Sequence, residues 1–313
     1  MSKFDPVTSY NTKKLIEIDI LKCAILLIIL SHLGFFLNFS MDVYPLLHYA
    51  YFGPTFAYTG LSMFIFASGY TISSRYKSLE TKEDITRYFK KRIIRIYPIW
   101  WIGLLFEFII FGIFHINPAP YTENFSSLMG LLYQLTGVHG FFKADMEIGG
   151  GHIDWFVGTI LVYYVVYAIT AKYARDDIEI FIISLSIYIV CYLYHTLDPR
   201  FYLYYPVFLI GIFAGRYNLL NITHSYFSQI PLSVQGIIYY IAQSSYATYV
   251  IHQPLLSVVK YLNNKLGITG LMEVCVIFIA SLIVIIIGYN IQKWVSGFNY
   301  NTLNRSMAQK NIN

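Results

Sequence analysis

Long apolar stretches, separated by shorter polar ones, follow one another along almost the whole chain. Ala24–Leu30 and Val274–Gly288 are nearly free of polar side chains, and both lie within runs close to the roughly 20 residues that cross a bilayer. We predict spans near residues 14–37, 50–73, 93–115, 152–171, 178–196, 200–216, 243–263 and 268–292. The apolar segments 125–138 and 226–242 are short or interrupted, and each fits either a full span or a re-entrant piece. The pattern predicts an all-α, polytopic transmembrane helix bundle of about 8–10 spans.

The basic residues predict how this bundle is oriented. The connection between the second and third spans holds eight of them, namely Arg75, Lys77, Lys82, Arg87, Lys90, Lys91, Arg92 and Arg95, whereas residues 116–139 hold none. Basic loops stay on the cytoplasmic side, so this connection is expected there, together with both basic termini. We therefore expect a cytoplasmic N-terminal tail (1–12), one transmembrane domain (13–295) and a cytoplasmic C-terminal tail (296–313).

The composition agrees with a chain that is embedded in lipid. Hydrophobic residues make up 57% and charged residues 12% of the sequence, whereas soluble proteins have about 25% charged residues. The net charge of +5 follows from basic cytoplasmic loops and indicates no nucleic-acid partner. Cys23, Cys191 and Cys275 lie in apolar runs without metal-ligand spacing, so we expect packing roles and no metal. We predict a multi-pass protein of the cell membrane in contact with the lipid bilayer.

Ionisable residues within the first span are the first candidate site. Such groups are costly at membrane depth and usually mark a cavity, an ion path or a reactive centre. Asp19 and Lys22 are three residues apart and can pair on one helix face. His32 lies about 15 Å further along the same helix. It fits either an interfacial histidine bonded to a neighbouring helix or a general base or nucleophile, since imidazole titrates near neutral pH.

Three further groups combine polar residues with predicted helix ends. Arg92 and Arg95 stand one turn apart where the third span begins, which suits phosphate binding but also anchoring to lipid headgroups. His152, Asp154 and Trp155 follow three glycines and fit a binding loop or an interfacial belt. Tyr246 and His252, shortly before Pro254, fit hydrogen bonding between helices, and a structural role is favoured for them.

Six short segments, in this order, are similar to those of the acyltransferase 3 family of multispanning enzymes. They are Asp19-Ile-Leu-Lys22 with His32, Phe64-Ile-Phe-Ala-Ser68-Gly69-Tyr70, Arg92-x-x-Arg95-x-x-Pro98, Trp155-Phe-Val-Gly-Thr159, Phe208-Leu-Ile-Gly211 with Gly215, and Ser245-Tyr246-x-x-Tyr249-x-x-His252-x-Pro254. The resemblance implies transfer of an acyl group, often acetyl or succinyl, to sugars of surface glycans and related acceptors. Lys22 replaces a frequent arginine, and one residue fewer separates it from His32, so a direct partnership of these two is doubtful.

The resemblance implies a role for each candidate residue. His32 corresponds to the family's catalytic histidine, and Arg92 and Arg95, with Lys22, are expected to hold the phosphates of acyl-CoA, with acetyl-CoA as the favoured donor. The glycan or glycolipid acceptor is expected to meet Asp19, Ser68, His152, Asp154, Trp155, Tyr246 and His252. His32 would deprotonate the acceptor hydroxyl or carry the acyl group itself.

Two other classes of protein remain as alternatives. A secondary transporter or flippase of a glycan or lipid intermediate also buries ionisable groups, but it typically shows inverted repeats, which this sequence lacks. A relative without catalysis could act as a sensor or scaffold, which the retained His32, Arg92 and Arg95 disfavour. The sequence names neither the acyl group nor the acceptor, nor the oligomeric state.

Overall fold

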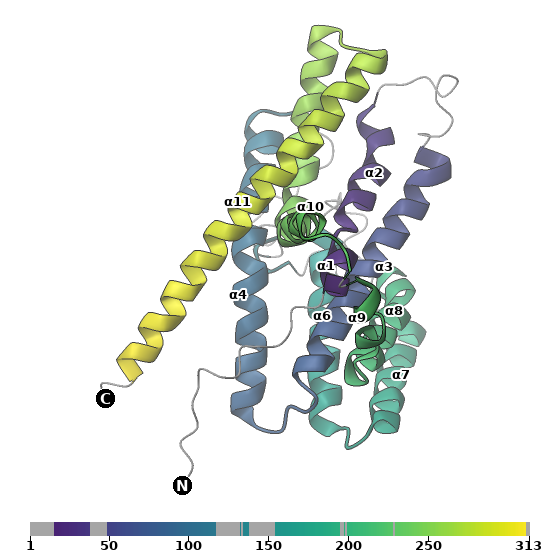
Figure 1. The fold of residues 1–313 in the computed structure, drawn as a ribbon, viewed down its shortest axis with the longest axis vertical. Helices are drawn as coiled ribbons and strands as arrows, with labels where there is room; N and C mark the ends of the chain where they lie inside the picture. The colour runs from purple at the N-terminus through teal and green to yellow at the C-terminus, as the bar shows by residue number, and fades with distance from the viewer. Residues whose placement is uncertain are drawn as a thin grey trace.

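The computed structural model describes residues 16–37, 49–116, 132, 134–137, 154–194, 197, 199–227 and 229–310, and these residues form helices without a strand (Figure 1). The helices are α1 (Ile16–Lys22), α2 (Ile25–Phe36), α3 (Tyr49–Arg75), α4 (Lys82–Glu107) with the π-helical turn η3 (Phe108–Ile113), α6 (Asp154–Tyr173), α7 (Asp177–Tyr194), α8 (Pro199–Arg216), the short η7 (Leu219–Ile222) and α9 (His224–Phe227), α10 (Leu232–Leu266) and α11 (Gly270–Lys310). The all-α, polytopic bundle is confirmed. Most of the predicted segment 125–138 lies outside the described residues.

Four helical stretches among the described residues are long and apolar enough to cross a membrane. They are Lys82–Ile113, Trp155–Tyr173, Asp177–Tyr194 and Gly270–Gly297. The helices at the other predicted spans are shorter, broken or richer in Tyr, Ser and Gly, which lowers their mean hydropathy. The chain is therefore a membrane protein, while the count of 8–10 spans and the cytoplasmic termini stay predictions.

Two boundaries differ from the predicted spans. The first span is broken at Cys23 and Ala24, where Ala24 N donates to Leu21 O (3.3 Å) and Leu26 N donates to Cys23 O (3.0 Å). The predicted segments 226–242 and 243–263 are joined, because one continuous helix, α10, covers most of both. No proline or glycine stands at 242 or 243 to interrupt its hydrogen bonds, and α10 ends only at the left-handed Gly267.

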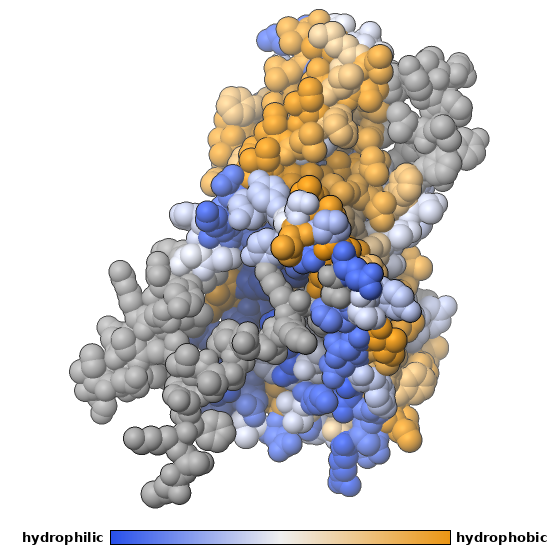
Figure 2. All heavy atoms as spheres, in the orientation of Figure 1, coloured by the Kyte–Doolittle hydropathy of each residue, from blue (hydrophilic) through white to orange (hydrophobic). Residues whose placement is uncertain are grey.

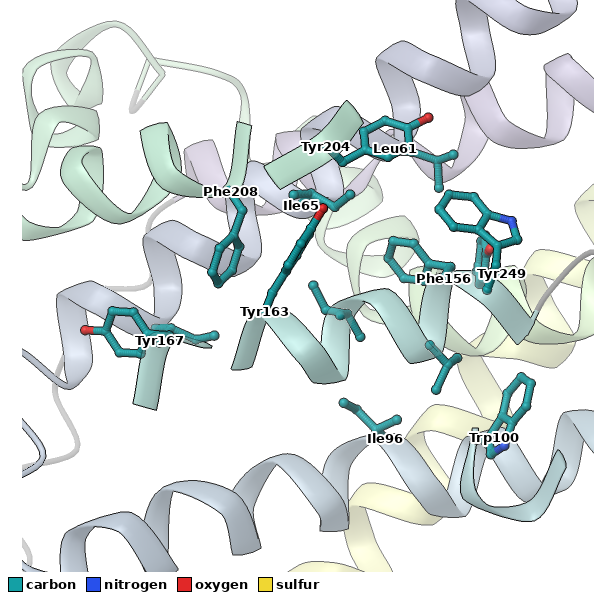
Figure 3. Close-up of a cluster of buried hydrophobic side chains, with 14 of the residues drawn as sticks. Leu61, Ile65, Ile96, Trp100, Phe156, Tyr163, Tyr167, Tyr204, Phe208 and Tyr249 are labelled. Carbon is teal, nitrogen blue, oxygen red and sulfur yellow. The ribbon is translucent and has the colours of Figure 1, made fainter. Parts of the chain in front are cut away.

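Small residues bring α3 and α8 into contact along their backbones. A Cβ atom added at Gly211 would lie 2.4 Å from the backbone oxygen of Phe66, and one at Gly69 would lie 2.4 Å from that of Phe208. Only glycine allows this approach, which is typical of helix pairs in membranes. Beside this contact, the Tyr163 ring of α6 stacks on Phe208 with centroids 4.8 Å apart. The two side chains are neighbours in Figure 3. The helices that carry the polar residues are thus held in a tightly packed frame.

The end of α3 is fixed by hydrogen bonds from two other helices. Tyr167 of α6 donates to the backbone oxygen of Tyr76, and Arg216 of α8 donates to that of Lys77 at 2.9 Å. Arg216 also pairs with Asp177 at the start of α7. These bonds place Arg75, the last residue of α3, beside the basic half of α4.

The two ends of the bundle differ in polarity, as Figure 2 shows. Hydrophobic surface covers the upper part of this view, where α10 and α11 form a hairpin, and hydrophilic surface gathers over the lower part, where the chain passes from α3 to α4. This distribution agrees with the predicted cytoplasmic position of the basic connection.

The topology can be tested by labelling cysteines placed at the two ends. In a protein whose Cys23, Cys191 and Cys275 are replaced by alanine, we expect Lys82→Cys to react only with a cytoplasmic reagent and Lys265→Cys only with an external one. Both positions are exposed, and they lie at opposite ends of the bundle in Figure 1. Labelling of both from the same face would contradict the predicted orientation.

Candidate active site

His32 lies on α2 with its ring held by the backbone of its own helix. The Nδ1 atom is 2.8 Å from the carbonyl oxygen of Ile28 and 3.1 Å from Ser31 Oγ, which itself donates to the same carbonyl at 2.6 Å. A carbonyl oxygen only accepts, so the Nδ1 atom carries the proton in this arrangement. The Nε2 atom is left with its lone pair, and the side-chain nitrogen of Gln253 lies 3.0 Å from it. His32 therefore presents the nitrogen that a general base requires.

A second histidine lies against His32. The His252 ring of α10 stands edge-on to it, with centroids 5.1 Å apart and planes at 71°. His252 is completely buried, its Nδ1 donates to Tyr249 O at 2.6 Å, and its Nε2 atom is buried without a hydrogen-bond partner. The structure thus brings together two candidate residues that are 220 positions apart. A contact of His252 with the acceptor stays a prediction.

A row of aromatic rings connects this histidine pair with Trp155. The Tyr249 ring lies 5.8 Å from His252 and 4.9 Å from Phe156, and Phe156 lies 6.0 Å from Trp155, in each case between centroids. Figure 3 shows Phe156 against Tyr249.

The Trp155 indole packs against two side chains of α8. The guanidinium carbon of Arg200 lies 4.4 Å from the ring centroid, and Tyr204 stacks on the ring at 5.9 Å. The Trp155 side chain is buried, so stacking of a sugar on it, the role predicted from the sequence, would require these neighbours to move. His152 lies outside the described residues, and Asp154 is described only as the first residue of α6.

Cationic side chains form a second centre where the end of α1, the end of α3 and the middle of α4 come together. The buried guanidinium of Arg92 lies over the rings of Tyr76 (5.4 Å), Tyr88 (5.1 Å) and Tyr164 (5.6 Å). Its Nε and Nη2 atoms are buried without a hydrogen-bond partner. Three aromatic faces stabilise this positive charge without neutralising it, which leaves the charge for an anion.

Arg95 adds a second guanidinium group of α4 to this centre. Its side chain interacts electrostatically with Arg75 of α3, Arg92 of α4, Tyr164 of α6 and Tyr246 of α10, so helices surround it. The residue is nevertheless exposed to solvent. Arg95 therefore has neighbours on α3, α6 and α10 and keeps part of its surface accessible.

Lys22 completes the cationic centre from α1. Its Nζ lies 3.4 Å from Asp19 Oδ1, which confirms the predicted pair, and it interacts with Arg75 and Arg95. Arg75 was assigned from the sequence only to the basic connection, and it belongs to this centre by position. We call Lys22, Arg75, Arg92 and Arg95 the cation cluster.

Two residues predicted to meet the acceptor lie beside the cation cluster instead of His32. Ser68 Oγ is 2.9 Å from the hydroxyl of Tyr164, whose ring lies over Arg92. The Tyr246 hydroxyl donates to Ile96 O at 3.3 Å, and this tyrosine is a neighbour of Arg95. Their positions suit the binding of an anionic molecule at the cation cluster as well as the predicted acceptor role.

The break between α1 and α2 changes the angle around the helix axis between the side chains of Lys22 and His32. In an uninterrupted α-helix, ten residues leave the two side chains about 80° apart. The tight hydrogen bonds at Cys23 and Ala24 follow the 3₁₀ pattern, which adds about 20° per residue and so reduces this offset. The shorter spacing therefore does not force Lys22 and His32 onto different faces.

A helical bundle that holds a histidine pair and a cation cluster defines a membrane protein with a polar site. The chain belongs to the acyltransferase 3 family, because the family model described as an acyltransferase domain matches residues 15–233. The family indicates an acyltransferase activity associated with the membrane. No curated protein and no solved structure shows a significant match.

The residues matched by the family model include only part of the candidate site. Residues 15–233 include His32 and the whole cation cluster but end before Tyr246, His252 and Gln253. The assignment of this part of α10 to the site therefore depends on the contacts of His252 and Gln253 with His32 and of Tyr246 with α4. Within the described residues, no group of three or more His, Cys, Asp or Glu side chains could hold a metal ion.

Proposed function

We propose that the protein transfers an acyl group, with acetyl as the favoured case, from acyl-CoA to a hydroxyl of a glycan or glycolipid. The observation that carries this proposal is the state of His32, whose Nδ1 is bound to Ile28 O and whose Nε2 is left as an acceptor. A hydroxyl becomes an effective nucleophile when such a base removes its proton. An uncharged imidazole held by its own helix is suited to that step.

The cation cluster supports an anionic donor. Arginine forks bind phosphate oxygens in pairs, and the partnerless Nε and Nη2 atoms of Arg92 provide donors of this kind. Arg95 is exposed, so it is available without unfolding of the helix. Acyl-CoA carries phosphates at one end and a thioester at the end of a long flexible arm. Its phosphates can therefore lie at the cation cluster while its thioester lies at His32.

The separation of the two centres follows from the helix geometry. Tyr246, beside Arg95, precedes His252 by six residues on α10, which corresponds to about 9 Å. Lys22 precedes His32 by ten residues, which corresponds to about 15 Å. A donor bound by its phosphates at the cation cluster would thus extend its thioester along the bundle toward His32.

The reaction can be written with His32 as the general base. The Nε2 atom takes the proton of the acceptor hydroxyl while the hydroxyl oxygen attacks the thioester carbonyl carbon. The carbon–sulfur bond then breaks, and the coenzyme A thiolate leaves with the proton that His32 returns. Ester and free thiol are the products, and the histidine regains its initial state.

The proposal is tested with purified protein in detergent and acetyl-CoA labelled in the acetyl group. With a membrane extract as the source of acceptor, we expect the label to pass into glycan or glycolipid. Without acceptor, we expect slow hydrolysis of the thioester. Movement of an acceptor across vesicles that contain the protein, with no consumption of acetyl-CoA, would contradict the proposal and favour a transporter.

A further inference from the structure

Gln253 is the polar group that lies directly at the reactive nitrogen of His32. Its side-chain nitrogen is 3.0 Å from His32 Nε2, and it follows His252 in α10. Since Nε2 has no proton in this arrangement, the amide group is the donor of the bond. Gln253 thus occupies the position that the hydroxyl of an acceptor needs for proton transfer.

Ser31 and His252, which also contact the His32 ring, use their hydrogen atoms elsewhere. Ser31 Oγ donates to Ile28 O, and the Nδ1 of His252 donates to Tyr249 O. The remaining nitrogen of His252 can only accept. Of these three neighbours, Gln253 alone therefore brings a hydrogen-bond donor to Nε2.

Acyl transfer needs such a donor beside the base. When the hydroxyl oxygen attacks, the thioester carbonyl oxygen becomes negatively charged, and a donor about 2.7–3.1 Å away stabilises it. The reacting carbon must at the same time lie close to the oxygen that His32 deprotonates. An amide within hydrogen-bond distance of Nε2 satisfies both conditions after a small rotation of its side chain.

We propose that Gln253 is a second catalytic residue and that it donates to the oxyanion formed from the thioester; this inference rests on the proposed acyl transfer. The acceptor hydroxyl displaces the amide from His32 Nε2 and passes its proton to that nitrogen as it attacks. The freed amide hydrogen bonds to the carbonyl oxygen while this oxygen holds the extra electron pair. When the carbon–sulfur bond breaks, the carbonyl re-forms, the proton returns to the thiolate, and Gln253 regains its bond to His32.

The first test replaces Gln253 by leucine, which keeps the bulk and removes the donor, and by glutamate, which keeps the length but cannot donate when ionised. Both variants are expected to lower the transfer rate at saturating donor by about 10²–10³-fold, the usual cost of an oxyanion donor. Gln243→Leu, ten residues earlier on α10, is the matched control and should stay within a few-fold of the parent. Elution as a monodisperse protein shows that each variant is folded.

The second test distinguishes an oxyanion donor from a residue that only holds His32 in place. It uses dithioacetyl-CoA, in which sulfur replaces the carbonyl oxygen and accepts hydrogen bonds weakly. The ratio of the rates with acetyl-CoA and with dithioacetyl-CoA is expected to fall by at least about tenfold in Gln253→Leu relative to the parent. A positioning role would slow both donors equally.

The possible outcomes separate this inference from the proposed function. A lower ratio together with a slower Gln253→Glu protein supports the oxyanion role. An unchanged ratio, or a Gln253→Glu protein as fast as the parent, overturns it while the acyl transfer by the parent stands. Absence of transfer by the parent itself overturns the proposed function, and this inference with it.

Discussion

The His32→Gln protein is expected to transfer acyl groups at least about 100-fold more slowly than the parent. Glutamine has a similar length and keeps hydrogen bonding, so it can replace a histidine that serves only in packing. It does not titrate near neutral pH and does not take the proton of a hydroxyl. General base catalysis contributes about 10²–10⁴-fold, and this factor should be lost.

Binding of the donor is expected to survive in His32→Gln. The cation cluster lies one or more helix turns away from His32, and none of its described contacts involves this ring. His115→Gln, the same substitution at an exposed histidine beyond η3, is the matched control. Initial rates at saturating donor and the Kd of coenzyme A are the two measurements. A transfer rate within a few-fold of the parent would show that His32 is a packing residue.

Replacement of Arg92 and Arg95 by alanine is expected to weaken coenzyme A binding by at least about tenfold for each lost phosphate contact. A hydrogen bond to a charged group contributes about 1.5–3 kcal/mol, and 1.4 kcal/mol corresponds to a factor of ten in Kd. Arg95→Ala should leave the fold intact, since this residue is exposed. Arg92→Ala also removes the contacts with three tyrosines, so its effect on stability should be larger.

The control for the arginine pair is the double variant Arg87→Ala/Lys90→Ala. It removes two positive charges from exposed positions of the same helix. If Arg92 and Arg95 serve only to attract the headgroups of lipids, their replacement should change the Kd of coenzyme A as little as the control variant does. A selective loss of binding in Arg92→Ala/Arg95→Ala is the result that a phosphate site requires.

The sequence predicted the helices well because long apolar runs and basic loops are direct signals of membrane spans. It did not predict the break at Cys23 and Ala24, since neither glycine nor proline stands there. The break consists only of backbone hydrogen bonds that span three residues instead of four. The continuity of α10 was missed for a related reason. Its first turns are largely exposed and mixed in polarity, so hydropathy separates them from the apolar remainder of the same helix.

The sequence predicted a contact within one helix, but it did not predict the contacts between candidate residues on different helices. The pair of Asp19 and Lys22 follows from a spacing of three residues on one helix, and it is present. The neighbourhood of His32 and His252 depends on how α2 packs against α10, which no local pattern encodes. Gln253 was missed because a search for ionisable side chains passes over a neutral amide. Arg75 was overlooked because its charge was already explained by the orientation of the bundle.

The account assigns donor binding to the cation cluster and chemistry to His32, and a single-turnover experiment tests this division directly. Labelled acetyl-CoA is mixed with excess protein and acceptor, and the rate of transfer is followed as the protein concentration is raised. We expect Arg92→Ala/Arg95→Ala to approach the parent rate at high concentration, whereas His32→Gln should remain at least about 100-fold slower at every concentration. Recovery of His32→Gln at high concentration, with no recovery of the arginine variant, would contradict the account.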